Sequence, residues 1–185
     1  MVLQLVRHQF TVKQFHQMAE SGILSENERV ELIRGEMIDM SPIGRRHAGC
    51  VNRLVNFLIQ LLGKQIVLAP QNPVELDETS EPQPDIALLK PRPDFYRNSH
   101  PQPEDIFLLI EVADTTVKYD REVKIPLYAE ANIPEVWLVD VNQEVVEVYR
   151  NPLQGVYQDV QTLVKNQILS ILAFPDMHIN VSEMF

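Results

Sequence analysis

The run IFLLIEVA at residues 106–113 decides the fold, because it is apolar along almost its whole length. Such a run is typical of a central strand that is buried on both faces of its sheet. Glu111 interrupts the run, and an ionised carboxylate in that position costs several kcal/mol unless it is paired or bound to a metal. The strand therefore requires a partner for Glu111.

Predicted strands and helices surround this run on both sides. A helix with a capping box is predicted from Thr11 to about residue 19, and a hairpin is predicted for RVELIRGEMIDM (29–40). Further helices are predicted at 45–63 and 120–131, and further strands at 66–70, 73–76, 85–90, 135–141 and 145–150. In the last helix, Asp120 is the expected N-cap, and Pro126 is expected to kink or divide the helix. The order predicts an α/β (α+β) fold with a mixed central sheet flanked by helices.

Length and composition indicate one globular domain over residues 1–185. The chain has 185 residues, one cysteine and no apolar run long enough to cross a bilayer. Its start, MVLQLVRHQF, lacks the features of a signal peptide. A lone thiol suits a reducing compartment. We therefore expect a cytoplasmic protein without membrane contact.

The formal net charge of −10 restricts the expected partners. Non-specific DNA binding comes mainly from lysine and arginine on phosphates, so this chain is a poor candidate for a DNA-coating protein. A metal-dependent enzyme remains compatible with the charge, because a bound cation reverses the field of clustered carboxylates.

Two acidic residues on neighbouring strands form the candidate site. Asp85 follows Pro84 at the start of one strand, and Glu111 lies in the next strong strand. Two converging carboxylates are what Mg²⁺ prefers, with water and phosphate oxygen completing its shell. Lys124 follows Asp120 by about one helical turn, so both side chains could lie on one face of the helix after this strand. A lysine in that position could stabilise charge that develops on a phosphate.

The chain resembles the Uma-two family of the PD-(D/E)xK nuclease superfamily, which has the restriction endonuclease-like fold. The matching pieces run from about residue 10 to residue 185, and they are RVELIRGEMIDMSP (29–42), His47, QPDIALL (83–89), LLIEVADTT (108–116), YDREVKIPLYAEANIPEVWLVD (119–140) and the terminal MF. The position two residues after Glu111 is Ala113 instead of the superfamily lysine. The resemblance therefore points to Lys124, on the next helix, as the replacement.

The resemblance also implies roles for individual residues. Asp85, Glu111 and the backbone carbonyl of Val112 are the expected Mg²⁺ ligands, with Mn²⁺ as a possible substitute. Lys124 and Glu31 complete the expected catalytic set. Hydrolysis of phosphodiester bonds in DNA is the expected activity. Nucleases of this fold commonly act as dimers, so a homodimer is expected as well.

Structural interpretations of the same residues remain open. A lysine or arginine could simply neutralise Glu111, Lys124 could be solvated helix surface, and Glu31 could be an ordinary strand-face charge. His47 and Arg46 lie at the start of a helix, where they could approach a phosphate or play no part in binding. Tyr119 and Tyr128 are expected to pack the helix. The remaining histidines match no metal-ligand spacing and are interpreted as surface or loop residues: His8, His16, His100 and His178.

A second function of another class fits the same sequence. The fold could serve as a catalytically silent module that binds nucleic acid or a protein partner. Both acids and a candidate lysine favour the enzyme, whereas the net negative charge favours the silent module.

Overall fold

The structure is a computed structural model that describes residues 7–25 and 27–185. The expectation that the chain has no signal peptide rests partly on residues 1–6, which lie outside the described residues. Within the described ranges, no helix is both long and apolar enough to cross a membrane.

A six-stranded mixed sheet forms the centre of the fold, with strand order β3-β4-β5-β6-β7-β8. All neighbouring strands are antiparallel except β5 and β6, which run parallel. The strands are β3 (Val67–Pro70), β4 (Ile86–Leu89), β5 (Ile106–Ala113), β6 (Glu135–Asp140), β7 (Val145–Leu153) and β8 (Val156–Val164). The apolar run that decides the fold is therefore β5, near the middle of the sheet, as its composition predicts.

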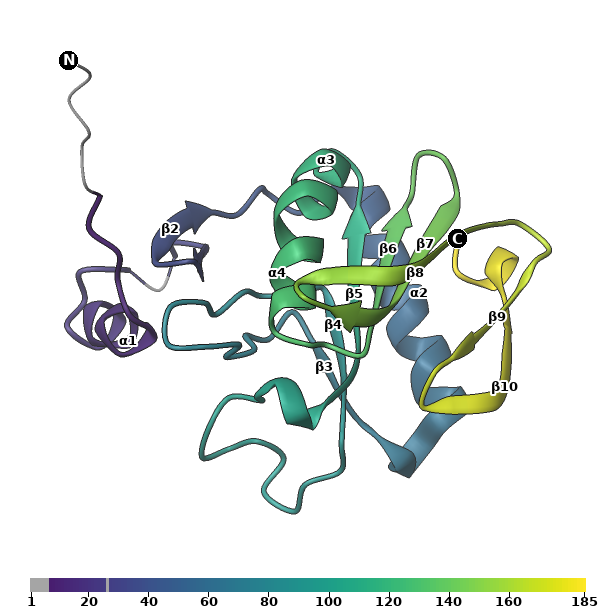
Figure 1. Ribbon diagram of the computed structural model, residues 1–185, viewed down its shortest axis with the longest axis horizontal. Helices are drawn as coiled ribbons and strands as arrows, with labels where there is room; N and C mark the ends of the chain where they lie inside the picture. The colour runs from purple at the N-terminus through teal and green to yellow at the C-terminus, as the bar shows by residue number, and fades with distance from the viewer. Residues whose placement is uncertain (1–6, 26) are drawn as a thin grey trace.

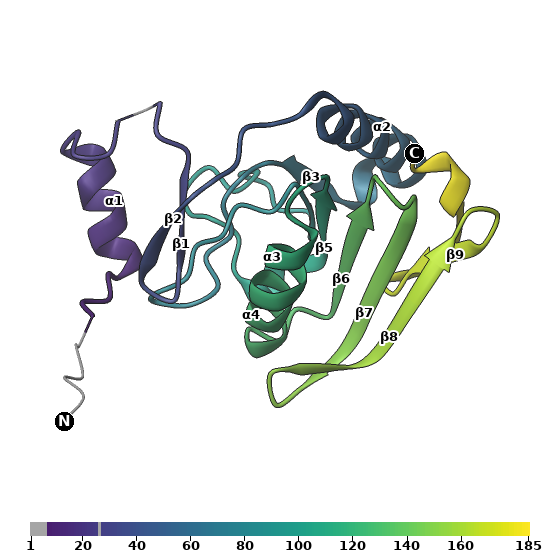
Figure 2. The same cartoon turned by 90° about the horizontal axis from the view of Figure 1, so that it is seen from above.

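Helices cover both faces of this sheet (Figures 1 and 2). On one face, α2 (Arg45–Leu62) packs on Leu108, Ile110 and Val112 of β5. On the other face, α3 (Val117–Tyr119) and α4 (Ile125–Glu130) lie over Leu109 and Ala113. Glu111 lies between Ile110 and Val112 in β5, so the two-residue alternation of a strand directs its side chain to the face of α4.

Smaller elements surround this sandwich. A second hairpin, β9 (Ile168–Ile171) and β10 (Phe174–Asn180), packs into the core beside α2. At the opposite end of the molecule lie α1 (Val12–Glu20) and the hairpin of β1 (Val30–Ile33) and β2 (Glu36–Asp39) (Figure 2). The α/β (α+β) fold with a mixed sheet flanked by helices is confirmed.

The hairpin turn has the geometry that its sequence predicts. Arg34 and Gly35 both have positive φ angles, 49° and 76°, as a two-residue turn of the type I′ class requires. A Cβ on Gly35 would lie 2.6 Å from the Cβ of Gln9, so only glycine fits there. The turn fixes the register that points Glu31 inward from β1.

The helix after β5 differs from the prediction at its start. It begins at Val117, and Asp120 lies one turn inside it, so the expectation of Asp120 as N-cap is wrong. A π-helical turn, Asp120–Lys124, ends two residues before Pro126, and the N–H of Ile125 donates to the carbonyl of Asp120. Pro126 does not divide the helix into two pieces, since residues 117–130 are helical without a break. The wider turn accommodates the missing N–H and the ring of the proline instead.

The segment 73–76 also differs from the prediction, since it forms no strand. Val74 and Leu76 are buried, but their N–H groups bond locally to the carbonyls of Pro82 and Ser80. Prolines at 73, 82 and 84 lack the N–H groups that a regular ladder would need. Burial of alternate side chains here reflects a compact loop rather than a strand.

Candidate functional site

Two adjacent strands bring Asp85 and Glu111 side by side. Ile86 of β4 is paired with Ile110 of β5 in antiparallel register. Asp85 comes one residue before Ile86, and Glu111 one residue after Ile110, so the two acids occupy the next position along the ladder. Both residues line a cleft of about 450 Å³.

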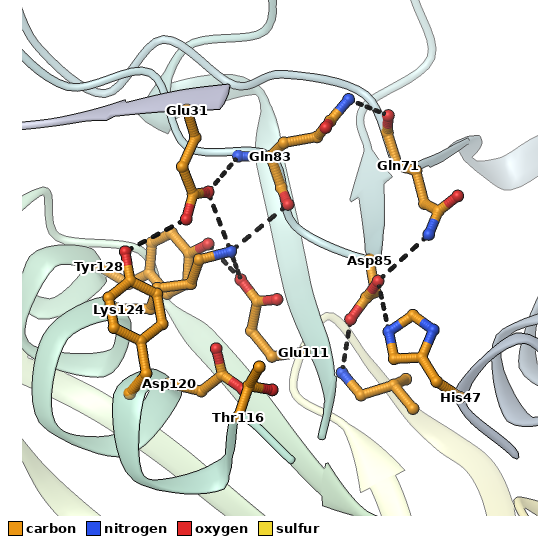
Figure 3. Close-up of polar contacts among 12 residues, drawn as sticks. Glu31, His47, Gln71, Gln83, Asp85, Glu111, Thr116, Asp120, Lys124 and Tyr128 are labelled. Carbon is orange, nitrogen blue, oxygen red and sulfur yellow. Dashed lines mark hydrogen bonds and ion pairs between the residues drawn. The ribbon is translucent and has the colours of Figure 1, made fainter. Parts of the chain in front are cut away.

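Lys124 lies at the centre of the site, between two carboxylates (Figure 3). Its Nζ is 3.1 Å from Oε2 of Glu31 and 3.2 Å from Oε1 of Glu111, and it also donates to the carbonyl of Gln83 over 3.4 Å. The residue is only 4% exposed. The interpretation of Lys124 as solvated helix surface is therefore wrong, and Glu111 does have a lysine partner.

Glu31 reaches this lysine from β1, a strand outside the central sheet. It is 3% exposed, which rules out an ordinary strand-face charge. Its Oε1 accepts a hydrogen bond from the Tyr119 hydroxyl at 3.2 Å, and its Oε2 accepts one from the backbone N–H of Gln83 at 3.1 Å. The buried carboxyl group is thus held with donors on both oxygens.

Tyr128 fixes the other carboxylate. Its hydroxyl donates to Oε1 of Glu111 over 2.5 Å, so Tyr128 does more than pack the helix. Lys124 and Tyr128 are four residues apart, the spacing that places two side chains on one helix face. This four-residue spacing is a signal in the sequence that indicates the place of Tyr128 beside Lys124.

Asp85 is held by a separate set of donors. Its Oδ2 accepts the backbone N–H of Val112 at 2.9 Å, which ties the acid directly to β5. Its Oδ1 lies 2.9 Å from Nε2 of His47 and 3.4 Å from Nε2 of Gln71. His47 reaches it from the first turn of α2, and the hydrogen bond to Asp85 raises the pKa of His47. His47 thus contacts Asp85, the expected metal ligand. Nothing in the sequence indicated that Gln71 also contacts it.

Asp120 is the third buried acid at the cleft, after Glu31 and Glu111. Its Oδ2 accepts the Thr116 hydroxyl at 2.7 Å. Burial raises its pKa to about 6, although Lys124 and the Thr116 hydrogen bond act in the opposite direction. The π-helical turn directs Asp120 and Lys124 toward the same cleft, since both residues line it.

The electrostatic balance of the cleft favours a bound cation. Burial raises the pKa of Glu111 to about 8, against the opposing effect of Lys124, and the charges of Asp120 and Asp85 raise it further. Burial alone would lower the pKa of Lys124, but the neighbouring carboxylates raise it, so the lysine stays charged. The cleft is lined by six carboxylates, namely Glu31, Asp39, Asp85, Glu111, Asp114 and Asp120. Arg29, His47 and Lys124 are its only possible cations among the described residues.

These donors fit a divalent ion such as Mg²⁺. Mg²⁺ is usually held by one or two carboxylates together with water and substrate oxygen. In the described part of the chain, Oε2 of Glu111 has no protein hydrogen-bond partner, and Oδ2 of Asp85 accepts only the Val112 N–H, which leaves this oxygen a lone pair for a cation. Val112 also lines the cleft. The roles of Asp85, Glu111 and the Val112 carbonyl as ligands nevertheless stay predictions.

His47 and Arg46, the two candidate binding residues at the start of α2, have different surroundings in the structure. His47 lines the cleft, but the guanidinium of Arg46 bonds to the side chain of Asn142 and the carbonyl of Val141. Arg29 was not predicted as a site residue, but it is exposed, lines the cleft and forms no ion pair with the described residues. Arg29 is therefore better placed than Arg46 to contact a ligand in the cleft.

Two histidines outside the cleft also differ from expectation. His100 does lie in a loop, as expected, but His16 and His100 are not scattered, because both lie beside the buried Glu81. Their spacing of 84 residues in sequence follows no metal motif, and only the fold brings them together.

Comparisons with known proteins agree with the fold. A solved structure described as "a putative nuclease belonging to DUF820 from Anabaena variabilis ATCC 29413" superposes with a TM-score of 0.72 at 15% sequence identity, and the match covers 95% of this chain and 97% of that one. No curated protein matches the chain. A family model described as "Uma2: Putative restriction endonuclease" matches residues 12–182. With nearly all of its length matched, this chain belongs to the Uma2 family.

Proposed function

We propose that the chain is a Mg²⁺-dependent endonuclease that hydrolyses phosphodiester bonds in DNA, with Mn²⁺ able to replace Mg²⁺. One observation carries this proposal: Asp85 and Glu111 lie on adjacent strands in one cleft, with the charged amine of Lys124 3.2 Å from Glu111. Membership of the Uma2 family supports the same reaction class.

Asp85, Glu111 and the backbone carbonyl of Val112 would hold the ion. When bound, Mg²⁺ supplies charge neutralisation for the phosphate and activates a water molecule. The protein would hold these ligands in fixed orientations. His47 and the Val112 N–H orient Asp85, and Tyr128 and Lys124 orient Glu111.

Lys124 would act as a fixed positive charge. Because its pKa is raised, it keeps its proton at neutral pH and cannot serve as a general base. A fixed ammonium group beside the scissile phosphate stabilises charge as it develops. Glu31 and the Gln83 carbonyl hold this amine in place.

The substrate phosphate would enter past Arg29 and the start of α2. Gly44, the N-cap of α2, lines the cleft and makes no side-chain capping bond, so the first N–H groups of the helix are not capped. Helix N-termini and arginine both attract phosphate. The excess of carboxylates makes the cleft a poor site for DNA in the absence of a cation, which argues against a silent DNA-binding module.

Nicking of supercoiled plasmid, with and without Mg²⁺ or Mn²⁺, tests the proposal. Asp85→Asn and Glu111→Gln should each lower the metal-dependent rate by at least about a hundredfold, whereas Asp159→Asn, an exposed acid on β8, should nick like the wild type. Cleavage that survives in both cleft variants would contradict the proposal. A wild-type protein that binds plasmid but never cleaves it, with either metal, would establish the silent module instead.

Cleavage of both strands of a duplex needs two such clefts, so a homodimer belongs to the proposal. Light scattering on the purified protein measures this directly. A mass near twice 21.3 kDa is expected, and a monomer would restrict the protein to nicking.

A further inference from the structure

A second group of potential metal ligands lies outside the cleft, formed by His16, Glu81 and His100. One ligand atom from each residue lies within 4.8 Å of the others. Among the residues that the structure describes, no other set of three His, Cys, Asp or Glu side chains meets that distance. The three residues come from α1, from the loop before β4 and from the proline-rich loop before β5.

Glu81 is the buried member of the group. Its side chain is 3% exposed, and Nε2 of His16 lies 3.0 Å and 2.8 Å from its two oxygens. His16 is the only described side chain that contacts this carboxylate within hydrogen-bonding distance. A buried carboxylate with so few donors is expensive, and a metal ion is one way of compensating it.

Backbone hydrogen bonds hold each of the three segments independently of any ion. The N–H of Val12, at the start of α1, bonds to the carbonyl of Glu78 at 2.8 Å. Glu81 and Leu32 exchange N–H···O bonds of 2.8 and 3.3 Å. Pro101, directly after His100, accepts the N–H of Glu75 at 2.9 Å. The ligands are therefore brought together by the fold itself, which reduces the ordering cost of binding.

Two imidazoles and one carboxylate are a donor set for zinc. In a tetrahedral site, zinc–ligand bonds of about 2.0–2.2 Å place ligand atoms about 3.3–3.6 Å apart. The present separations are at most 4.8 Å, so the ligand atoms must approach one another by no more than about 1.5 Å when the ion binds. The side chain of His16 is 39% exposed, which leaves room for a water molecule in the fourth position. Mg²⁺ prefers oxygen ligands and would not compete for this site.

We propose that His16, Glu81 and His100 bind one Zn²⁺ ion that fastens α1 and the proline-rich loop to the segment before β4. Glu81 lies two residues before Gln83, which hydrogen-bonds to Glu31, and it pairs with Leu32, the neighbour of Glu31. The ion therefore also stabilises the two backbone segments that carry Glu31 and Asp85. This site is separate from the cleft and does not depend on the proposed nuclease activity.

Zn²⁺ titration of tag-free, chelator-treated protein tests the site, with calorimetry for stoichiometry and a thermal melt for stability. The expected stoichiometry in the Asp85→Asn background, which weakens zinc binding in the cleft, is one ion per chain. A free zinc concentration a hundredfold above Kd should raise the melting temperature by about 5–10 °C. Mg²⁺ at the same concentration should leave the melt of this variant unchanged.

Variants of each ligand identify the residues that bind. His16→Gln, Glu81→Gln and His100→Gln should each weaken zinc binding by more than about tenfold, whereas His178→Gln, an exposed histidine on β10, should bind like the parent protein. If Glu81→Gln does not fold, the His100→Gln variant keeps the test valid, because His100 lies in a loop. Zinc affinity that is unchanged in both His16→Gln and His100→Gln, or no zinc binding in the folded parent protein, would overturn the proposal and leave His16 and Glu81 as a simple ion pair.

Discussion

Nζ of Lys124 lies 3.2 Å from Oε1 of Glu111, although the residue two positions after Glu111 is an alanine. The lysine comes from the helix that follows the strand, at the end of a π-helical turn and two residues before Pro126. A basic group therefore reaches the carboxylate of β5 from a different element than the PD-(D/E)xK pattern prescribes. What matters at the site is where the lysine amine lies in space, beside Glu111, and not how many residues separate the two in the sequence.

Removing this charge should destabilise the protein strongly. Lys124→Met leaves Glu31 and Glu111 buried without their common cation, and breaking such a pair costs about 3–5 kcal/mol. Urea denaturation at pH 8 measures the loss. Lys118→Met is the matched control, because Lys118 is exposed on the same helical segment and should cost less than about 0.5 kcal/mol. Equal losses in the two variants would show that Lys124 does not neutralise the buried acids.

The stability of the metal-free protein should fall as the pH rises from 5 to 8. Glu111 has a pKa of about 8 in the folded chain against 4.5 for the free side chain, so the folded state binds its proton more tightly than the unfolded state does. Stability is then fully present at low pH and is lost as the pH rises toward 8. His47, whose pKa is also raised, acts in the same direction. Urea denaturation in a chelator measures the trend.

Glu111→Gln isolates the contribution of this one carboxyl group. The variant cannot ionise, so it should lose less stability between pH 5 and pH 8 than the wild type, by about 2–4 kcal/mol. Parallel pH dependences of the two proteins would mean that Glu111 is already charged throughout this range.

Divalent ions should reverse that loss. Mg²⁺ competes with protons for the carboxylates of the cleft, so it should raise the melting temperature more at pH 8 than at pH 6. Asp85→Asn should abolish the effect, and Asp159→Asn should retain it. A shift of the same size at both pH values would show that the ion binds elsewhere.

Tyr128→Phe should change the pH at which the ion binds. The Tyr128 hydroxyl favours the charged form of Glu111, so its removal should raise the pKa of Glu111 further, by about one unit. The Mg²⁺ affinity should therefore reach its plateau at a higher pH than in the wild type. Tyr157→Phe, which removes a buried hydroxyl from the carbonyl of Ile133, is the control and should leave the profile unchanged. A lower affinity with the same pH profile would give Tyr128 a purely structural role.

The sequence predicted most of the fold because the decisive signals were local. A continuous apolar run predicted β5, the Thr11 capping box predicted α1, and Arg34-Gly35 predicted the hairpin turn. The errors came from local patterns with more than one solution. An aspartate such as Asp120 is as compatible with a helix N-cap as with a buried position one turn inside the helix. The alternating apolar residues of 73–76 are as compatible with a compact loop as with a strand.

The candidate site was predictable only where residues belong to the strands or to the helix after them. Asp85 and Glu111 were predicted from the strand order, and Lys124 from its place in the next helix and from the resemblance. Gln71 and Arg29 reach the cleft through loop paths that one sequence does not determine, whereas the four-residue spacing from Lys124 was a usable signal for Tyr128. The group of His16, Glu81 and His100 depends on three segments that only the tertiary fold brings together.

The most direct test of the proposed metal site is a crystal grown with Mn²⁺ and measured at a wavelength where manganese scatters anomalously. An anomalous peak between Asp85 and the free Oε2 of Glu111, absent from crystals of Asp85→Asn, is the expected result. Crystals that hold Mn²⁺ elsewhere but show no peak between these two carboxylates would contradict the assignment of Asp85 and Glu111 as the ligands of a nuclease metal ion.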